Sequence, residues 1–228
     1  MKKLSTYIFI ISFLGVLGAC SNTPKLASEP MPKSGFLPNY SVLQSMSVSE
    51  SDARVWRYRK AGVSPGSYTA VILDPIYLNQ NATQNIGADV ISQTKLALQQ
   101  SMIEAINNRG NVRIVSQPGP GVARLSVGIT GGELSNDSLQ PWNFTPVGLA
   151  LNAAAYAGGV NSKTPALLVE SKITDSQSND LLGEGLVTLQ GESFRTGSGS
   201  VESFVAMAKK VVRLAMETSA NPTPTPIK

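Results

Sequence analysis

The residue types that this sequence lacks restrict the catalytic and metal-binding chemistry that the protein can carry out. The 228 residues include one Cys and no His. Without His there is no imidazole for acid–base catalysis or metal binding, and no Ser-His-Asp or Cys-His arrangement. A single Cys excludes a disulfide framework and a thiolate zinc cluster. The chemistry that remains belongs to one thiol, to a hydroxyl beside a lysine, and to carboxylates.

The thiol of Cys20 ends a segment with three parts. Lys2 and Lys3 precede an apolar run from Leu4 to Val16, and Leu17-Gly18-Ala19 then leads to the Cys. The run is shorter than the roughly 20 apolar residues that span a bilayer, so it predicts an export signal. An ordinary secretory signal that ends in a chance cysteine is the alternative to a lipoprotein signal.

Leu17-Gly18-Ala19-Cys20 resembles the lipobox of bacterial lipoproteins. The resemblance implies a signal peptide over 1–19, diacylglycerol on the Cys20 thiol and an acylated amine after cleavage. Each buried methylene contributes about 0.8 kcal/mol, and stable anchoring takes at least two chains. Membrane lipid is thus an expected partner. Ser21 stands where Asp resembles an inner-membrane retention signal, so the resemblance implies the outer membrane, with the domain facing the periplasm.

Charge gives no argument for nucleic acid. Removing 1–19 takes Lys2 and Lys3 and lowers the formal net charge from +4 to +2. The segment from Arg54 to Lys60 mixes cations with two aromatic rings, which suits anionic headgroups or cell-wall material. A solvated edge strand with half-packed rings explains the same pattern.

Two further groups of residues fit known catalytic chemistry only in part. Ser92 and Lys95 match the Ser-x-x-Lys of penicillin-binding enzymes, but Lys163-Thr164 runs into Pro165 rather than Gly, so we interpret the match as chance. The carboxylates that could pair as in a glycosidase do not cluster in sequence: Asp74, Glu133, Glu170, Asp175, Asp180 and Glu184. We expect no catalytic residues, no cofactor and no metal site.

One domain must position these residues. A flexible tether over 20–33 and a Pro/Thr-rich tail over 217–228 flank a domain over 34–216. Hydrophobic periodicity predicts helices over 87–109 and from Ser200, as N-cap, to Met216. It predicts strands over 68–73, 111–116, 123–129, 167–173 and 182–189, with Gly131-Gly132 ending the third. This order predicts an α+β fold, a two-layer domain in which helices lie mainly on one face of a mixed β-sheet.

The segment from Ser34 to Leu43, SGFLPNYSVL, resembles the opening of bacterial lipoproteins grouped as "domain of unknown function 3313". Tyr68 to Pro75, Gly119-Pro120-Gly121 before Arg124-Leu125, and Ile129-Thr130 are similar in the same order. The resemblance covers roughly 34–216. It implies a small α+β module of envelope lipoproteins, and it brings no activity or catalytic residues. Within the opening, Phe36, Leu37 and Tyr40 are expected to pack on the domain and hold the tether against it.

Small apolar residues fill the stretch from Leu149 to Gly159. Either this is a helix packed closely on the sheet, or it is a contact surface for an envelope protein. In the second case Trp142, Phe144 and Ala154 would mark the surface. Together these features predict a non-enzymatic interaction or structural module of the envelope. The alternative is a cell-wall hydrolase that uses carboxylates.

Replacing Cys20 by Ala is expected to abolish lipid attachment, because the thiol is the only nucleophile in the lipobox. Cells fed a labelled fatty acid should incorporate it into the wild-type protein but not into Cys20→Ala, which should remain uncleaved or leave the membrane fraction. Incorporation of label into the variant would contradict the lipoprotein interpretation.

Overall fold

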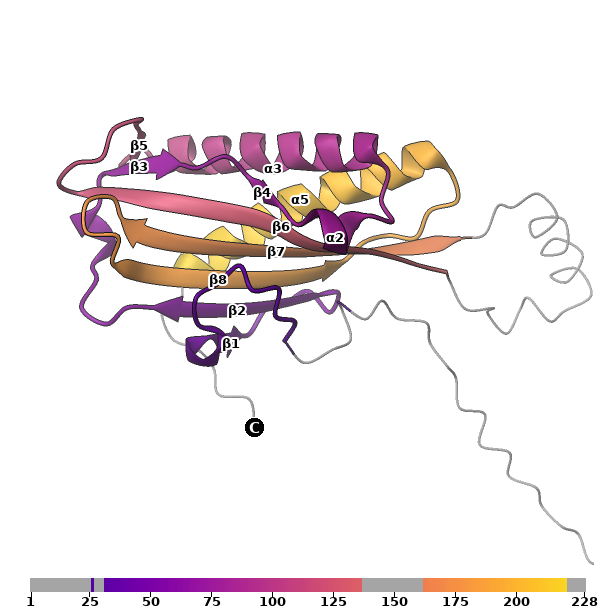
Figure 1. The fold of residues 1–228 in the computed structure, drawn as a ribbon, viewed down its shortest axis with the longest axis horizontal. Coiled ribbons are helices and arrows are strands. Elements are labelled where there is room, and N and C mark those ends of the chain that lie inside the picture. The colour runs from indigo at the N-terminus through magenta and orange to yellow at the C-terminus, as the bar shows by residue number, and fades with distance from the viewer. Residues whose placement is uncertain (1–25, 27–30, 137–161, 221–228) are drawn as a thin grey trace, which may run out of the picture.

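The structure is a computed structural model that describes residue 26 and residues 31–136 and 162–220 (Figure 1). An eight-stranded sheet organises this part of the chain. The strands are β1 Gln44–Met46, β2 Ala53–Arg59, β3 Ala70–Leu73, β4 Tyr77–Leu78, β5 Arg113–Ile114, β6 Val122–Asn136, β7 Lys163–Asp175 and β8 Leu181–Gln190. The described helices are α2 Gln80–Thr83, α3 Ala88–Arg109 and α5 Gly197–Ala220, with 3-10 turns η1 Tyr40–Val42 and η2 Pro65–Ser67.

The sheet is mixed, as the sequence predicts. Its order is β1-β2-β8-β7-β6-β3-β5, and β4 pairs with β6 off that path. Neighbours from β1 to β6 are antiparallel. Strands β3 and β4 pair with β6, and β5 with β3, in parallel. Figure 1 shows α3 and α5 together on one face, which confirms the predicted two-layer α+β arrangement.

Alternation along the long strands β6, β7 and β8 sorts side chains between the two faces of the sheet. Those on the helix face join a single large core that α3 and α5 cover. Its fully buried members include Leu98, Ile129, Leu167, Leu189, Phe204 and Leu214.

The segment before β1 covers part of the opposite face, which we call the outer face. Leu37 is buried there against Leu168 and Leu186. Phe36 and Tyr40 are half-buried beside it. The expectation that these three side chains pack on the domain is confirmed.

Helix α3 begins and ends within one residue of the predicted bounds. Asp89 lies in its first turn and Arg109 in its last, each at the end of the helix dipole that suits its charge. Gly110 follows with a φ of 69°, a left-handed conformation that glycine adopts without strain.

Three predicted boundaries are wrong: the end of β6 and both ends of α5. Gly131-Gly132 does not end a strand: β6 continues to Asn136 through an irregularity between Ile129 and Gly131, a bulge that glycines tolerate. Helix α5 begins at Gly197, three residues before Ser200, and extends to Ala220 rather than Met216. The side chain that caps its first turn is that of Thr196 and not that of Ser200: the Oγ1 of Thr196 accepts the N–H of Gly199 at 3.2 Å.

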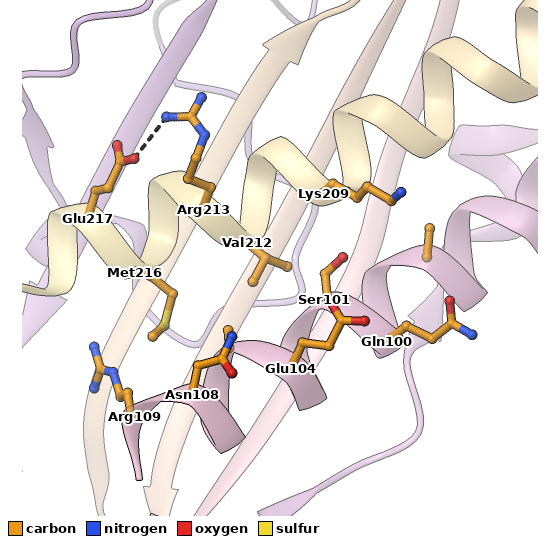
Figure 2. A pocket seen from close by; sticks show the side chains of 12 residues that line it. Gln100, Ser101, Glu104, Asn108, Arg109, Lys209, Val212, Arg213, Met216 and Glu217 are labelled. Carbon is orange, nitrogen blue, oxygen red and sulfur yellow. Dashed lines mark hydrogen bonds and ion pairs between the residues drawn. The ribbon is translucent and has the colours of Figure 1, made fainter. Parts of the chain in front are cut away.

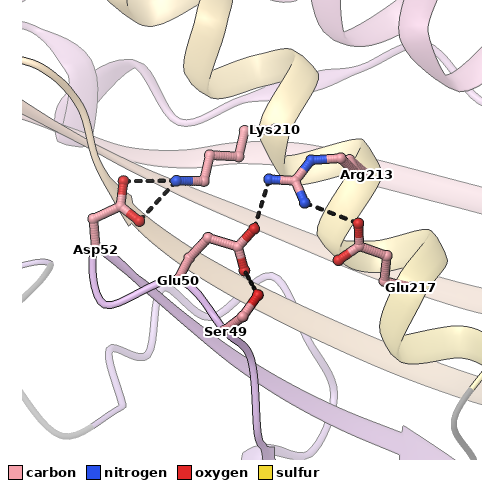
Figure 3. Close-up of polar contacts among 6 residues, drawn as sticks. All are labelled: Ser49, Glu50, Asp52, Lys210, Arg213 and Glu217. Carbon is pink, nitrogen blue, oxygen red and sulfur yellow. Dashed lines mark hydrogen bonds and ion pairs between the residues drawn. The ribbon is translucent and has the colours of Figure 1, made fainter.

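Ion pairs orient α5 against the turn between β1 and β2 (Figure 3). The Nζ of Lys210 lies 2.7 Å from both carboxylate oxygens of Asp52. Arg213 contacts Glu50 at 2.7 Å and Glu217 at 2.8 Å. Its guanidinium lowers the pKa of Glu50 below the ordinary value. Pairs this exposed stabilise a fold only weakly, so their effect is mainly to set the orientation of the helix.

Candidate functional site

The residues that the sequence marks for anchoring and partner binding lie outside the described residues. These are Cys20, Ser21, Trp142, Phe144 and Ala154. Ser92 lies exposed on α3, and among the described residues no hydrogen bond joins it to Lys95.

Most of the carboxylates considered in the sequence hold local structure. Asp74 binds Arg124 and the hydroxyl of Ser126, both at 2.6 Å. Asp175 accepts the backbone N–H groups of Ser178 and Gln177, each at 2.9 Å, and these bonds lower its pKa. Both carboxylates are therefore engaged by neighbours that fix turns and strand ends.

Glu170 and Glu184 do come together, on the outer face. In the register of β7 and β8, Glu170 is opposite Leu186 and Glu184 is opposite Lys172. The two acids are thus diagonal neighbours, and such residues are about 7–8 Å apart, with their Cβ atoms somewhat closer. Glycosidase carboxylates require a separation of this order, about 5–9.5 Å.

Burial argues against catalysis by this pair. Glu170 is 0% exposed and Glu184 is 3% exposed. The hydroxyl of Ser34, in the covering segment, donates a hydrogen bond to Oε2 of Glu170. Burial raises the pKa of Glu184, an effect that the nearby backbone N–H of Asn39 and the charge of Lys172 oppose. A polysaccharide cannot reach either carboxylate while this segment is in place.

The phenol of Tyr40 organises that covering segment. Its oxygen accepts the backbone N–H of Gly35 at 2.8 Å and that of Ser34 at 3.1 Å. The ring of Phe36 stacks on Tyr77 at 5.4 Å between centroids, and Lys172 Nζ lies 5.1 Å from the same ring. The opening motif is therefore a structural clamp over two buried acids.

A different feature can take a ligand: a cavity of about 660 Å³ between the sheet and the C-terminal ends of α3 and α5. Figure 1 shows that α5 runs obliquely to α3, so the helices diverge toward these ends. The walls are mostly apolar, and include Ile106, Leu125, Ile173, Leu182, Val212 and Met216. Sites for small organic molecules typically enclose about 300–1,000 Å³ and are lined in this way.

Two glycines of β8 help to keep this space open. Gly183 and Gly185 lie beside Arg59 and Arg57 of β2, their register partners. A Cβ at Gly185 would lie 2.9 Å from the Oγ of Ser171, closer than real Cβ contacts allow. At these two positions β8 therefore adds no side chain to the floor of the cavity.

Three arginines stand at the exposed end of the cavity: Arg57, Arg59 and Arg109. Each binds the last turns of α5. Arg57 donates to the Ala215 carbonyl at 3.3 Å, Arg59 to the Ser219 carbonyl at 2.9 Å, and Arg109 to the Ser219 hydroxyl at 2.7 Å. The negative end of the helix dipole favours cations at this location.

The arginine cluster carries more positive charge than the neighbouring acids balance. Within the described part of the chain, no ion pair links any of the three arginines to Asp or Glu. Burial lowers the pKa of Arg57 to about 10, and the charges of Arg59 and Arg109 act in the same direction. The residue remains protonated at neutral pH, so the end of an apolar cavity is strongly cationic.

A second hollow lies between α3 and α5 on the outside of the helix layer (Figure 2). Side chains of both signs line it, among them Glu104, Lys209, Arg213 and Glu217. Arg213 and Glu217 already pair with each other. Mixed charge in an open groove defines no ligand chemistry, so the cavity beneath the helices is the better candidate.

In the ranges described, no three His, Cys, Asp or Glu side chains lie close enough to hold a metal ion. None of the helices in these ranges is long and apolar enough to cross a bilayer.

Sequence patterns singled out the segment from Arg54 to Lys60 but not the site it builds. The edge-strand interpretation is wrong, because β2 pairs with β1 on one side and β8 on the other. Trp56 packs on the outer face, whereas Arg57 and Arg59 reach α5. Glycines at alternate positions of β8 were the available signal, since an interior strand glycine often marks a close approach or an open space.

Comparisons with known proteins show the family of the chain. A family model described as "Protein of unknown function (DUF3313)" matches residues 32–215. The chain is 25% identical over 179 residues to the uncharacterized lipoprotein YdcL of Escherichia coli K12, which covers 78% of this chain and 79% of that protein.

The solved structures that resemble the chain are more distant. A DUF4136 family protein from Bacteroides thetaiotaomicron is 10% identical, with a TM-score of 0.39, over 75% of this chain and 97% of that one. The PelC dodecamer from Paraburkholderia phytofirmans is 12% identical, with a TM-score of 0.33, over 69% and 96%. At these TM-scores neither likeness supports a conclusion about function.

The buried acid on β8 predicts how stability depends on pH. Because the pKa of Glu184 is raised, its contribution to stability is complete below about 4.5 and is lost as the pH rises through the raised value. Glu184→Gln should therefore gain about 1 kcal/mol or more at pH 7, since an ionised buried group costs more than a neutral amide. Below pH 4.5 the gain should vanish.

Urea unfolding at pH 4 and pH 7 measures this difference. Glu104→Gln, at an exposed position of α3, is the matched control and should show no such dependence. A gain from Glu184→Gln of equal size at both pH values would show that burial of its charge is not the cause.

Proposed function

This chain belongs to the DUF3313 family, and on that premise we propose that it is a non-enzymatic ligand-binding lipoprotein, anchored in the outer membrane and facing the periplasm. The relative YdcL is a lipoprotein, which supports a membrane-anchored location in the envelope. The Leu17–Cys20 segment supplies the attachment site, and Ser21 supports sorting to the outer membrane.

The cavity between the sheet and the helices carries the binding part of the proposal. Its walls come from β2, β6, β7, β8 and both long helices, so it is built by the whole fold rather than by one loop. Half-buried apolar side chains such as Leu125, Ile173 and Met216 line it, whereas Leu98 and Val169 nearby are almost completely buried. An apolar ligand would remove the exposed surface from water, which favours binding by about 25 cal/mol per Å².

The hydrolase alternative gains no support from the carboxylates. The pair that the strand register brings together, Glu170 and Glu184, is covered by the segment that Tyr40 organises. A binding function needs no accessible pair of carboxylates, and it uses the cavity between the sheet and the helices, which is open.

Filling the cavity should release the ligand. The full-length protein, purified from membranes in the detergent tetraethylene glycol monooctyl ether, is expected to retain a small apolar molecule that native mass spectrometry detects. Ala105, half-buried on α3, lines the cavity. Ala105→Phe should reduce retention at least tenfold, because the added ring occupies the same space.

Leu96→Phe is the matched control, on the same helix at a position that is 48% exposed, and should retain the ligand like the wild type. The proposal is wrong if the wild-type protein retains nothing, or if Ala105→Phe, folded by its melting temperature, retains as much as the wild type.

The sorting part of the proposal rests on the residue after the anchor. Ser21→Asp should move the protein from the outer to the inner membrane fraction in a Gram-negative host, because Asp at that position resembles a retention signal. Density-gradient separation of the two membranes measures the shift, and Ser21→Asn controls for side-chain size. An unchanged distribution of Ser21→Asp would contradict outer-membrane sorting and leave lipidation untouched.

A further inference from the structure

We propose that the cavity binds an anionic amphiphile. The alkyl chain of this ligand would lie in the apolar interior, and Arg57, Arg59 and Arg109 would bind its phosphate or carboxylate headgroup. This inference rests on the proposed binding function and specifies its ligand. It depends on the juxtaposition of a cavity with mostly apolar walls, among whose described residues Glu184 is the one acid, and a group of three cations at its exposed end.

The fold forces the three guanidinium groups together. Arg57 and Arg59 are alternate residues of β2, so both side chains leave the sheet on the helix face. Arg109 is the last residue of α3 and arrives from the other side of the cavity. The last turns of α5, at Ala215 and Ser219, bring the three to one place.

Repulsion within this group makes an anion favourable. Burial lowers the pKa of Arg57 most, the charges of Arg59 and Arg109 lower it further, and the described acids make no ion pair with the cluster. The helix dipole supplies only a fraction of a negative charge. A bound anionic headgroup would offset the repulsion, and an uncharged headgroup would leave it in place.

The arginines also have hydrogen-bond donors to offer. Each guanidinium carries five N–H groups, and the bonds to α5 use one nitrogen of each. The remaining groups match the oxygen geometry of phosphate and carboxylate, which arginine binds in bidentate fashion. Ser64 and Ser219 also line this end of the cavity and add hydroxyl groups.

Depth distinguishes the ligand from a free anion. The residues that line the cavity extend from Arg59 at the exposed end to Leu98, Val169 and Val187, all of which are nearly fully buried. A free phosphate would satisfy the arginines but leave these apolar walls uncovered. An amphiphile fulfils both requirements at once.

The test compares two amphiphiles with the same chain. Full-length protein in tetraethylene glycol monooctyl ether is titrated with n-dodecyl phosphate or with n-dodecyl maltoside, and native mass spectrometry counts the molecules bound. We expect the wild type to bind n-dodecyl phosphate at least tenfold more tightly. Inorganic phosphate at the same concentrations should not displace it.

Substitution of the arginines should remove the preference for n-dodecyl phosphate and keep the apolar cavity intact. The variant with Arg57→Gln, Arg59→Gln and Arg109→Gln should bind n-dodecyl phosphate at least tenfold more weakly and n-dodecyl maltoside as before. Arg59→Gln alone, at an exposed position, should lose severalfold and keeps the test valid if the triple variant does not fold. Arg195→Gln, exposed before the N-terminus of α5 and thus at its other end, is the matched control.

The outcomes separate the two proposals. Equal binding of both amphiphiles to the wild type and to the arginine variants would overturn anion recognition while the binding function stands. Displacement by inorganic phosphate at equal concentration would show that the alkyl chain of the ligand is not recognised. It would overturn the proposal that the ligand is an amphiphile. If neither amphiphile binds the wild type and Ala105→Phe changes nothing, the binding function fails as well.

Discussion

Two helices have to cover a sheet that is wider than they are. Seven strands lie along the main path of the sheet, and at about 4.8 Å between strands they span roughly 29 Å. Two helices side by side cover about 20 Å. Helix α5 also runs obliquely to α3, so the covered area is smallest where the two helices end. The cavity follows from this shortfall and needs no special loop or insertion.

The outer face shows the same constraint resolved in another way. With no helix there, the segment before β1 lies over β7 and β8, and Leu37 seals the contact. That cover also encloses Glu170 and Glu184, which are almost completely buried. Burying polar groups at these positions lowers the stability of the fold. The hydrogen bond from Ser34 to Glu170 offsets part of this loss, and Tyr40 holds the segment that carries Ser34 in place.

The cations on and around α5 differ in whether an acidic side chain balances them. Most exposed cations on α5 have an acidic partner, as Lys210 has Asp52 and Arg213 has Glu50. The three arginines of β2 and α3 that contact the C-terminal end of α5 bind carbonyls and hydroxyls instead. A helix C-terminus attracts cations but does not neutralise three of them. The result is an apolar chamber that ends in uncompensated positive charge.

The sequence alone determined the features that depend on local pattern. The α3 helix bounded by Gly110 and the alternating strands of the sheet follow from residue types at short spacing, and the same kind of pattern predicts the lipobox at Cys20. The class of fold followed as well, because so few strands leave room for helices on one face. Gly131-Gly132 misled the prediction, since a glycine pair marks a strand end and a bulge equally well.

Tertiary structure alone decided which distant residues meet. Arg57 and Arg109 are 52 residues apart in the chain (109 − 57), and no periodicity relates them. Only the register of β2 with β8, and the oblique path of α5, bring them to one cavity. Likewise, Glu170 and Glu184 become neighbours only through the β7–β8 pairing, and only the packing of the segment before β1 buries them. Local sequence specifies each element, but the gaps between elements depend on how they pack.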